Sequence, residues 1–246
     1  MPFGCWVTFV RDDDAVPKVL VLLNSLRVCH TSKKIVLILG NSISPDNITR
    51  MGHYADGFIQ LNSPPELASL PSVAARLHCW SIPGFSKIIF LDTDCIVLQN
   101  VDNLFTYTKT GKIGISKDTF DEKEISVLVL EPSFEFYQQI IADLKSSMKT
   151  DDAHQWLRRY LTKLPYCEEL HEKYSIRVNP KASIGATSLP SIAIIHEVDV
   201  GNGYDSNDDY GSISKVAGHE PIAIIGVSCR FPEANSIDEY WELLIK

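Results

Sequence analysis

The sequence has no long hydrophobic run and no cluster of basic residues. Its longest apolar stretches, such as residues 19–23 and 35–39, are short, whereas a membrane-spanning helix needs about 18 apolar residues in a row. The 23 Lys and Arg residues are outnumbered by 31 Asp and Glu residues, and the net charge is −8. An acidic chain without a basic patch is poorly suited to binding nucleic acid. We therefore expect neither a membrane span nor a nucleic-acid partner.

A secretory signal and paired cysteines are also missing. Arg11 and three aspartates follow only a brief apolar stretch at the N-terminus, which is not the pattern of a signal peptide. The six cysteines are scattered and form no C-x-x-C pair, so a zinc site or a disulfide framework is disfavoured. Most of them are expected to be small buried side chains. These absences predict a soluble, cytoplasmic protein.

What the sequence does contain is the composition of a globular α/β domain. Its hydrophobic content of 45% is enough for a sizeable core. The alternation of strand and helix patterns predicts a mainly parallel sheet with helices on both faces, in which ligands bind beyond the carboxyl ends of the strands. Strands are expected at residues 5–10, 35–39, 57–61, 87–91, 126–130 and 192–196, and helices from Pro17, after the turn at 41–45, and at 73–81, 134–148 and 152–164.

The composition changes abruptly after His196. Residues 199–218 are rich in Gly, Asp, Asn and Ser, which is typical of a linker. Residues 219–246 return to an apolar strand pattern, followed by a capping box that begins at Ser236. One strand and one helix cannot bury a core of their own. We expect a domain at residues 1–198, a flexible linker at 199–218 and the truncated beginning of a second domain at 219–246.

The chemically most informative segment is residues 87–94. An apolar strand, KIIFL, is followed directly by Asp92 and Asp94, with Thr93 between them. Paired carboxylates suit Mg²⁺ or Mn²⁺, cations that complete their coordination with water and substrate phosphates. A D-x-D pair alone is weak evidence, because Asp12 and Asp14 form another. The position after a buried strand is what favours a metal site.

Three segments around this pair resemble glycogenin and its relatives in family 8 of the retaining glycosyltransferases. The segments are RLHCWS at residues 76–81, FSKIIFLDTD at 85–94 and VLQNVDNLF at 97–105. The resemblance is densest over residues 73–105 and extends more weakly over about 5–196. It implies a nucleotide-sugar-binding fold of the GT-A type and a UDP-sugar donor, such as UDP-glucose, bridged by Mn²⁺.

The same resemblance implies which residues form the site. Asp92 and Asp94 match the aspartates that contact metal and nucleotide, and His196 matches a third metal ligand. A histidine that simply ends a strand is an equally good interpretation of His196. Arg76 stands where the family has a lysine near the donor diphosphate, so a cation is kept there. The implied donor-binding set is Thr8, Asp12, Arg76, Asp92, Thr93 and Asp94.

Other distinctive residues near the pair need no catalytic role. His78, Cys79 and Trp80 lie on a helix expected to pack against the sheet, where core positions are the favoured interpretation. Cys95 follows Asp94 directly, but no activating partner for a nucleophilic thiol is evident.

Four elements of the family pattern are replaced in this sequence. The loop whose aromatic packs on uracil is DDDA at residues 12–15, and the Asn-Ser-Gly element aligns with residues 124–126. The Gly-Asp-Gln-Gly sugar-binding motif aligns with residues 151–155, where Asp152 and Gln155 are weak candidates for catalytic residues. The basic Lys-Pro-Trp segment is replaced by residues 198–204, which hold no cation. The metal-binding half of the site is thus better matched than the half that orients the sugar.

The last segment carries a second resemblance, to the beginning of the ketosynthase domain of modular polyketide synthases. It reads EPIAIIGVSCRFP at residues 220–232. Cys229 does not match the ketosynthase nucleophile, since that cysteine and its two histidine partners lie far downstream in the family. No condensing activity is implied.

These observations support three hypotheses. The first is a metal-dependent retaining hexosyltransferase that uses a UDP-sugar. The second is a degenerate domain that binds a nucleotide-sugar weakly or not at all. The third, compatible with both, is the N-terminal piece of a fusion with downstream polyketide synthase domains. The acceptor is open between a glycan, a small molecule and a protein tyrosine, and none of Tyr160, Tyr166, Tyr174 and the linker tyrosines is singled out.

Overall fold

The fold is known here from a computed structural model that describes residues 3–63, 67–117, 125–147, 153–174, 176–178 and 194–197. The chain divides into two units, Met1–Glu197 and Val198–Lys246, and all described residues belong to the first. The expected linker at 199–218 and the expected partial domain at 219–246 lie outside the described residues. The boundary at residue 198 therefore stays a prediction.

A seven-stranded mixed sheet forms the centre of the first unit. The strands β3, β2, β1 and β4 are parallel, β7 runs antiparallel to β4 and β6, and β8 is parallel to β6. The predicted α/β class with a mainly parallel sheet is confirmed. In spatial order the strands are β3 (Gly57–Gln60), β2 (Lys34–Ser42), β1 (Gly4–Asp12), β4 (Lys87–Leu91), β7 (Val127–Leu130), β6 (Ile113–Ile115) and β8 (Cys167–Glu169).

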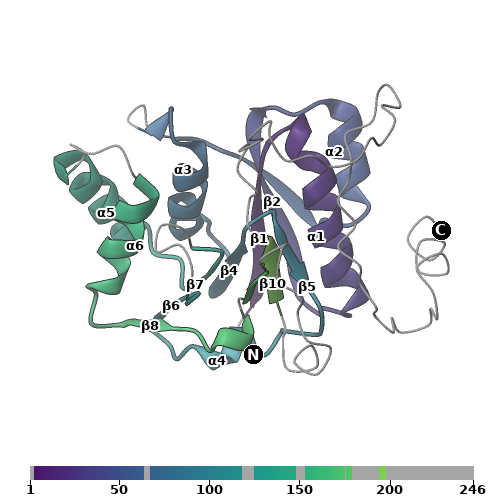
Figure 1. The fold of residues 1–246 in the computed structure, drawn as a ribbon. Helices are drawn as coiled ribbons and strands as arrows, with labels where there is room; N and C mark the ends of the chain where they lie inside the picture. The colour runs from purple at the N-terminus through teal and green to yellow at the C-terminus, as the bar shows by residue number, and fades with distance from the viewer. Residues whose placement is uncertain are drawn as a thin grey trace, which may run out of the picture. The chain divides into compact units, whose positions relative to one another are not determined.

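Helices cover both faces of this sheet (Figure 1). Helices α1 (Val16–Val28) and α2 (Pro45–Gly52) lie on one face, and α3 (Pro71–His78), α5 (Phe134–Ser147) and α6 (Ala153–Thr162) lie on the other. Alternate side chains of β1 divide between two cores, because successive residues of a strand point to opposite faces. Trp6 and Val10 pack toward α1, whereas Val7 and Phe9 pack toward α3 and α6. All five residues of β4 are buried, as expected of a strand covered on both faces.

A second, three-stranded sheet lies beside the first and consists of β5 (Cys95–Val97), β10 (Ile194–Glu197) and β9 (Ile176–Val178). Both backbone groups of Val97 in β5 form hydrogen bonds with side chains of α1 and of the residue that follows it. The Val97 N–H donates to Ser25 Oγ at 3.1 Å, and Cys29 Sγ donates to the Val97 carbonyl at 3.4 Å. The position of β5 therefore depends on the position of α1.

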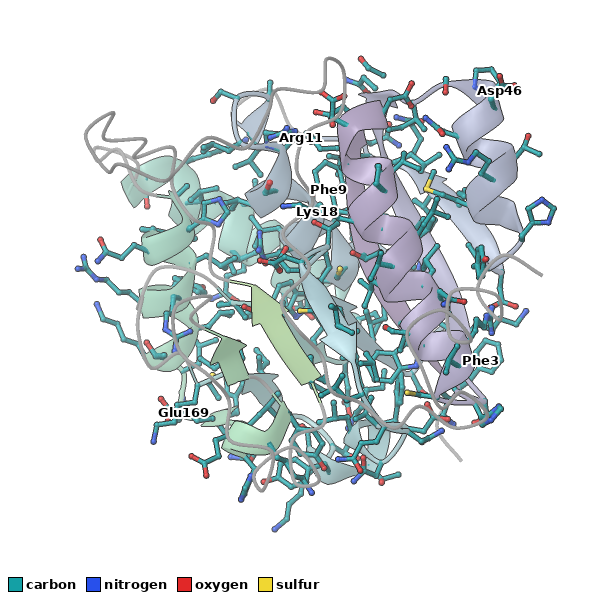
Figure 2. All side chains as sticks on the ribbon, turned by 45° about the vertical axis from the view of Figure 1, so that its right-hand side comes forward. Phe3, Phe9, Arg11, Lys18, Asp46 and Glu169 are labelled. Carbon is teal, nitrogen blue, oxygen red and sulfur yellow. The ribbon has the colours of Figure 1, made fainter. Side chains whose placement is uncertain are left out.

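The end of β1 contains a bulge. The pairing of β1 with β2 shifts between Val10 and Asp12, and the Arg11 carbonyl approaches β2 at Gly40. A Cβ at Gly40 would lie 2.1 Å from this oxygen, so only glycine fits here without a backbone shift. Figure 2 shows Arg11, near the end of β1, and Asp46, which follows β2, at the top of the described domain, with Phe3, just before β1, lower on the right.

Polar residues of the 97–105 segment connect it to the end of α1. Asp102 accepts hydrogen bonds from the Ser32 N–H at 2.7 Å and from Ser32 Oγ at 2.8 Å, and Asn100 Nδ2 donates to the carbonyls of Cys29 and His30 at 3.0 Å. His30 has a φ of 55° and occupies the left-handed position that ends many helices. These contacts are structural, so part of the glycogenin-like motif reflects the fold and not the reaction.

Most predicted elements are confirmed, including the four-residue strands β3, β7 and β10, whereas several other elements of three or four residues were missed. The missed elements are β5, β6, β8, β9, the 3₁₀ turns η1 (Asp13–Ala15) and η4 (Glu172–Tyr174), and α4 (Leu104–Tyr107). The predicted helix at 73–81 ends in another 3₁₀ turn, η3 (Cys79–Ser81). Elements of three or four residues rarely show a periodicity of their own. Within the described ranges, no helix is both long and apolar enough to cross a membrane.

Candidate functional site

The two D-x-D aspartates lie in a tight turn between β4 and β5. The Asp92 N–H donates to the Ser126 carbonyl at 3.0 Å, which extends the pairing of β4 with β7 by one residue. The Cys95 N–H then donates to the Asp92 carbonyl at 3.1 Å and closes the turn. Asp92, Thr93 and Asp94 are each partly exposed there. The structure thus places this set where parallel sheets bind ligands, beyond the carboxyl end of a central strand.

Arg76 is turned inward, toward Asp92. Its Nη2 pairs with Asp92 Oδ2, its Nε donates to the Ile125 carbonyl at 3.3 Å, and its Nη1 donates to the Ser72 carbonyl at 3.2 Å. The guanidinium carbon also lies 5.3 Å from the centre of the Phe90 ring. The Arg76 side chain is only 3% exposed, whereas that of Asp92 is 21% exposed. The positive charge of Arg76 is therefore already paired with the carboxylate of Asp92.

The backbone of His196 lies next to the D-x-D turn. Strand β10 is antiparallel to β5, with His196 directly opposite Cys95, the residue after Asp94. Residues opposite each other in such a pair have Cα atoms about 5 Å apart. The tertiary structure thus brings the backbone of His196 next to the D-x-D pair, from which it is distant in the sequence. The side chain of His196 is not among those described.

The donor set at this turn fits a hard divalent cation. Two carboxylates at alternate positions of one turn supply the oxygen ligands that Mn²⁺ and Mg²⁺ prefer, and an imidazole is compatible with Mn²⁺. Among the described side chains, no group of three or more His, Cys, Asp and Glu residues forms a complete metal site. Asp92 and Asp94 would therefore hold the ion together with His196 or with ligands from the substrate and solvent.

The acidic loop after β1 has structural contacts. Asp12 Oδ1 accepts from the Ala15 N–H at 3.2 Å and caps the turn η1, and Asp12 Oδ2 pairs with Arg11 Nε at 2.6 Å. Asp13 Oδ1 accepts from the Ser44 N–H at 2.9 Å. Hydrogen bonds from the Asn47 side chain and the Ser44 backbone lower the pKa of Asp13 below its ordinary value. These carboxylates fix the start of α1 and α2 at the place where relatives are expected to hold the uracil ring.

The remaining predicted site residues are Thr8, a donor-binding candidate, and Gln155 and Asp152, the weak candidates for catalytic residues. Thr8 is buried in β1 on the face of Trp6 and Val10, and among the described residues its Oγ1 has no hydrogen-bond partner. Gln155 lies on α6, which shares a core with α3, the helix that carries Arg76. Asp152 lies outside the described residues. A buried hydroxyl without a partner in the described structure is a feature that a bound ligand would satisfy.

Ser116 and Arg158 are two buried residues near the turn that sequence reasoning missed. Ser116 Oγ accepts from the Ser126 N–H at 3.1 Å and from the Val127 N–H at 3.3 Å, and Arg158 Nη1 donates to the Ser116 carbonyl at 3.2 Å. A signal for Arg158 was present, because it occurs beside Leu157 on the apolar face of a helix, where an arginine needs buried acceptors. No sequence signal identifies Ser116.

The interpretation of the neighbouring residues as structural agrees with the structure. Cys79 and Trp80 are buried in the core, and the half-buried His78 bonds to Ser81 Oγ at 3.0 Å. Burial raises the pKa of the Cys95 thiol well above its ordinary value, and the charges of Asp94 and Asp92 add to the effect. A thiol in this environment is a poor nucleophile.

The three tyrosines named above as open candidates within the described domain, Tyr160, Tyr166 and Tyr174, are engaged in packing. The hydroxyl of Tyr160 donates to Asp143 Oδ2 at 2.7 Å, and that of Tyr174 accepts from Asn103 Nδ2 at 2.8 Å. Tyr174 is buried, and Tyr166 is half-buried with its ring against Phe136. Neither Tyr160 nor Tyr174 presents a free hydroxyl.

Comparison with curated proteins confirms the resemblance to glycogenin. Glycogenin-1 of Caenorhabditis elegans is 32% identical over 149 residues, which are 55% of this chain and 34% of that protein. Glycogenin-1 of mouse is 28% identical over 151 residues, 55% of this chain and 44% of that protein. A putative UDP-glucuronate:xylan alpha-glucuronosyltransferase 5 of Arabidopsis thaliana is 26% identical over 145 residues, 55% of this chain and 25% of that protein. The chain thus matches less than half the length of each relative.

Solved structures show the same fold. The galactosyltransferase LgtC, in complex with donor and acceptor sugar analogs, has a TM-score of 0.54 at 18% identity, over 78% of this chain and 86% of its own. The glycosyltransferase GlyE of Streptococcus pneumoniae has a TM-score of 0.58 at 14% identity, over 78% of this chain and 53% of its own.

The C-terminal segment matches a different family. Residues 219–246 match the beta-ketoacyl synthase, N-terminal domain. Methylphloroacetophenone synthase of Cladonia uncialis is 60% identical to this chain over 37 residues, which are 15% of this chain and 2% of that protein. The chain therefore combines a glycogenin-like sequence on the GT-A glycosyltransferase fold with a segment similar to the beginning of a beta-ketoacyl synthase.

Proposed function

We propose that the chain is a metal-dependent hexosyltransferase that uses a UDP-sugar and retains the configuration of the transferred sugar. The observation that carries the proposal is the D-x-D turn at the end of β4, with the backbone of His196 placed beside it by β10. The glycogenin-like sequence and the shared fold support it.

Each residue of the turn has a role in this proposal. Asp92, Asp94 and His196 hold the cation, which when bound neutralises the charge that develops on a leaving diphosphate. Arg76, which is buried beside the turn, fixes one carboxylate oxygen of Asp92. Thr93, in the turn, and the hydroxyl of Thr8, in β1, are further donor-binding groups for the nucleotide. Mn²⁺ is the preferred ion because it accepts both carboxylate and imidazole ligands.

The donor class is supported by the relatives. The Arabidopsis relative is named for UDP-glucuronate, and the LgtC structure holds a donor sugar analog. We propose UDP-glucose or a similar UDP-hexose. The acceptor is a glycan, a small molecule or a tyrosine other than Tyr160 and Tyr174, whose hydroxyls are already bound inside the domain.

The test is a titration of the full 246-residue chain with UDP in the presence and absence of Mn²⁺. Mn²⁺ should strengthen UDP binding, and Asp94→Asn should abolish this effect because a neutral amide replaces a charged ligand. Asp46→Asn, at an exposed carboxylate in the first turn of α2, is the matched control and should bind as the native chain does. No UDP binding at millimolar concentration, or an Asp94→Asn variant equal to the native chain, would sink the proposal.

A second candidate is a domain that binds the nucleotide-sugar without turnover. It is favoured by Asp12 and Asp13, which have structural contacts where relatives are expected to hold the uracil ring. This candidate predicts UDP binding that depends on Mn²⁺, together with neither hydrolysis of a UDP-hexose nor transfer to any acceptor. If the native chain releases UDP from UDP-glucose and the Asp94→Asn variant does not, the result favours the hexosyltransferase over this second candidate.

We further propose that residues 219–246 are the first part of a ketosynthase domain in a longer polyketide synthase fusion. The support is the family match and the identity with the Cladonia synthase. Sequencing the transcript beyond codon 246 tests this. An open reading frame that encodes the rest of a ketosynthase is expected, and an immediate natural stop codon would contradict it.

A further inference from the structure

The D-x-D turn depends on one neighbouring carbonyl, that of Ser126. Ser126 directly precedes β7 and is buried. Its carbonyl accepts the Asp92 N–H at 3.0 Å and the Cys95 thiol at 3.7 Å. The first and last residues of the turn therefore both bond to one oxygen, and a displacement of Ser126 displaces the turn.

The position of Ser126 is in turn set by the side chain of Ser116. The β6–β7 pairing in the sheet runs from Gly114 opposite Val129 to Ile115 opposite Leu128. Beyond it, the Ser116 N–H bonds to the Val127 carbonyl at 2.8 Å, while Ser116 Oγ accepts the N–H groups of Ser126 and Val127. The Ser116 hydroxyl thus extends the β6–β7 pairing by accepting N–H groups that would otherwise need a backbone carbonyl. Ser116 is 1% exposed, so water cannot easily replace it.

Ser116 is also the point at which α6 is joined to this region. Arg158 of α6 is buried and donates from Nη1 to the Ser116 carbonyl at 3.2 Å. Gln155, the candidate for sugar contact, lies three residues earlier on the same helix. A continuous path of hydrogen bonds therefore runs from α6 through Ser116 and Ser126 to Asp92.

We propose that Ser116 is a positioning residue, which fixes the D-x-D turn for metal binding and sets its placement relative to α6. This inference rests on the proposed function, because it concerns the same metal. Ser116 acts through the backbone of Ser126, whose N–H bonds to Ser116 Oγ and whose carbonyl accepts the Asp92 N–H. Residues that orient metal ligands from a distance commonly change metal affinity tenfold or more when they are replaced.

Mn²⁺ alone, titrated into the full chain and followed by its paramagnetic resonance signal, gives the measurement. Ser116→Ala removes the acceptor of two buried N–H groups and should raise the Kd for Mn²⁺ about five- to tenfold. Ser116→Thr keeps the hydroxyl and should stay within about twofold of the native chain. Thr108→Val removes a hydroxyl that is equally buried and that has no hydrogen-bond partner among the described residues. This control should leave the Kd unchanged.

All titrations are made at a temperature where circular dichroism shows each variant to be folded. If Ser116→Ala does not fold, Ser116→Cys replaces it, since sulfur is of similar size and a weaker acceptor, and should raise the Kd at least about threefold. A Kd equal to that of the native chain in the folded Ala or Cys variant overturns the inference, as does an equal loss in Thr108→Val. Failure of the native chain to bind Mn²⁺ contradicts the proposed function instead, so the two failures are distinguishable.

Discussion

The guanidinium of Arg76 forms an ion pair with the carboxylate of Asp92, from inside the protein. Arg76 is nearly fully buried and its other nitrogens bond to two backbone carbonyls, so the pair is part of the core as well as of the site. The sequence suggested a cation for the donor diphosphate. In the structure that cation is already engaged, and its first effect is on the carboxylate expected to bind the metal.

Arg76→Met should therefore destabilise the fold by about 2 kcal/mol, less than the usual cost of breaking a fully buried pair because Asp92 is partly exposed. Urea unfolding followed by circular dichroism measures the change. Arg11→Met removes the cation of the pair with Asp12, where the Arg11 side chain is 63% exposed, and should change the stability by less than about 0.5 kcal/mol. Equal effects of the two substitutions would contradict the assignment of Arg76 to the core.

Gly40→Ala should disrupt the bulge of β1. The added Cβ would lie 2.1 Å from the Arg11 carbonyl, so one backbone must move, at a cost of at least about 2 kcal/mol. Gly57→Ala is the matched control in the neighbouring strand. Its Cβ would meet only Val36 Cγ2 at 4.0 Å, and its effect should stay within about 1 kcal/mol. Thermal or urea unfolding of both variants gives the comparison, and a tolerated alanine at position 40 would refute it.

His30→Gly should stabilise the protein. His30 ends α1 with a φ of 55°, and the N–H groups of His30 and Thr31 bond back to Arg27 and Leu26 at 2.9 and 3.2 Å. A non-glycine residue in this conformation costs about 1 kcal/mol, which glycine avoids. His53→Gly, at the right-handed end of α2 with a φ of −70°, should instead destabilise by up to about 1 kcal/mol. Stabilisation by both glycines, or by neither, would show that the backbone conformation is not the cause.

The contribution of Asp56 to stability should depend on pH. Partial burial raises the pKa of Asp56, but the Ile35 N–H at 2.8 Å and Arg27 at 2.7 Å outweigh it, and the folded-state pKa lies below the ordinary value. As the pH falls, the unfolded chain is protonated first, so this stabilisation is present above a pH of about 4. It is lost as the pH falls further through the folded-state pKa.

Asp56→Asn should accordingly cost about 1 kcal/mol or less at pH 7, since the pair with Arg27 is about one-third exposed and screened by solvent. The difference from the native chain should shrink as the pH is lowered toward about 2. Urea unfolding at a series of pH values measures it. In an Arg27→Gln background the difference should be smaller at every pH. A difference that grows on acidification would reverse the predicted sign.

Long elements of the fold were predictable because their signals are local. The continuous apolar run of β4 and the proline near the start of α1 can be read without knowing any partner. The three residues of β5 carry no such signal. They form a strand because Ser25 of α1 and Cys29, the residue after α1, bond to Val97 and because β10 pairs with them.

The candidate site divides in the same way. Asp92 and Asp94 could be predicted as candidates from their position directly after β4, since residues adjacent in the sequence stay adjacent in any fold. The actual partner of Arg76 and the contact of Asp13 with Ser44 were not predictable. Each depends on side chains or backbone groups supplied by other segments of the chain.

The sequence by itself determined the strand–helix alternation, the paired carboxylates, the glycogenin-like pattern and the change of composition after His196. Only the tertiary structure decided that Arg76 points inward, that the backbone of His196 lies opposite Cys95 next to the D-x-D turn, and that Ser116 supports the turn through Ser126. The local sequence pattern determines which residues follow a strand, because neighbours along the chain are joined covalently. Which residues meet across the sheet is decided by packing, because those contacts join segments tens of residues apart and exist only once both cores have formed.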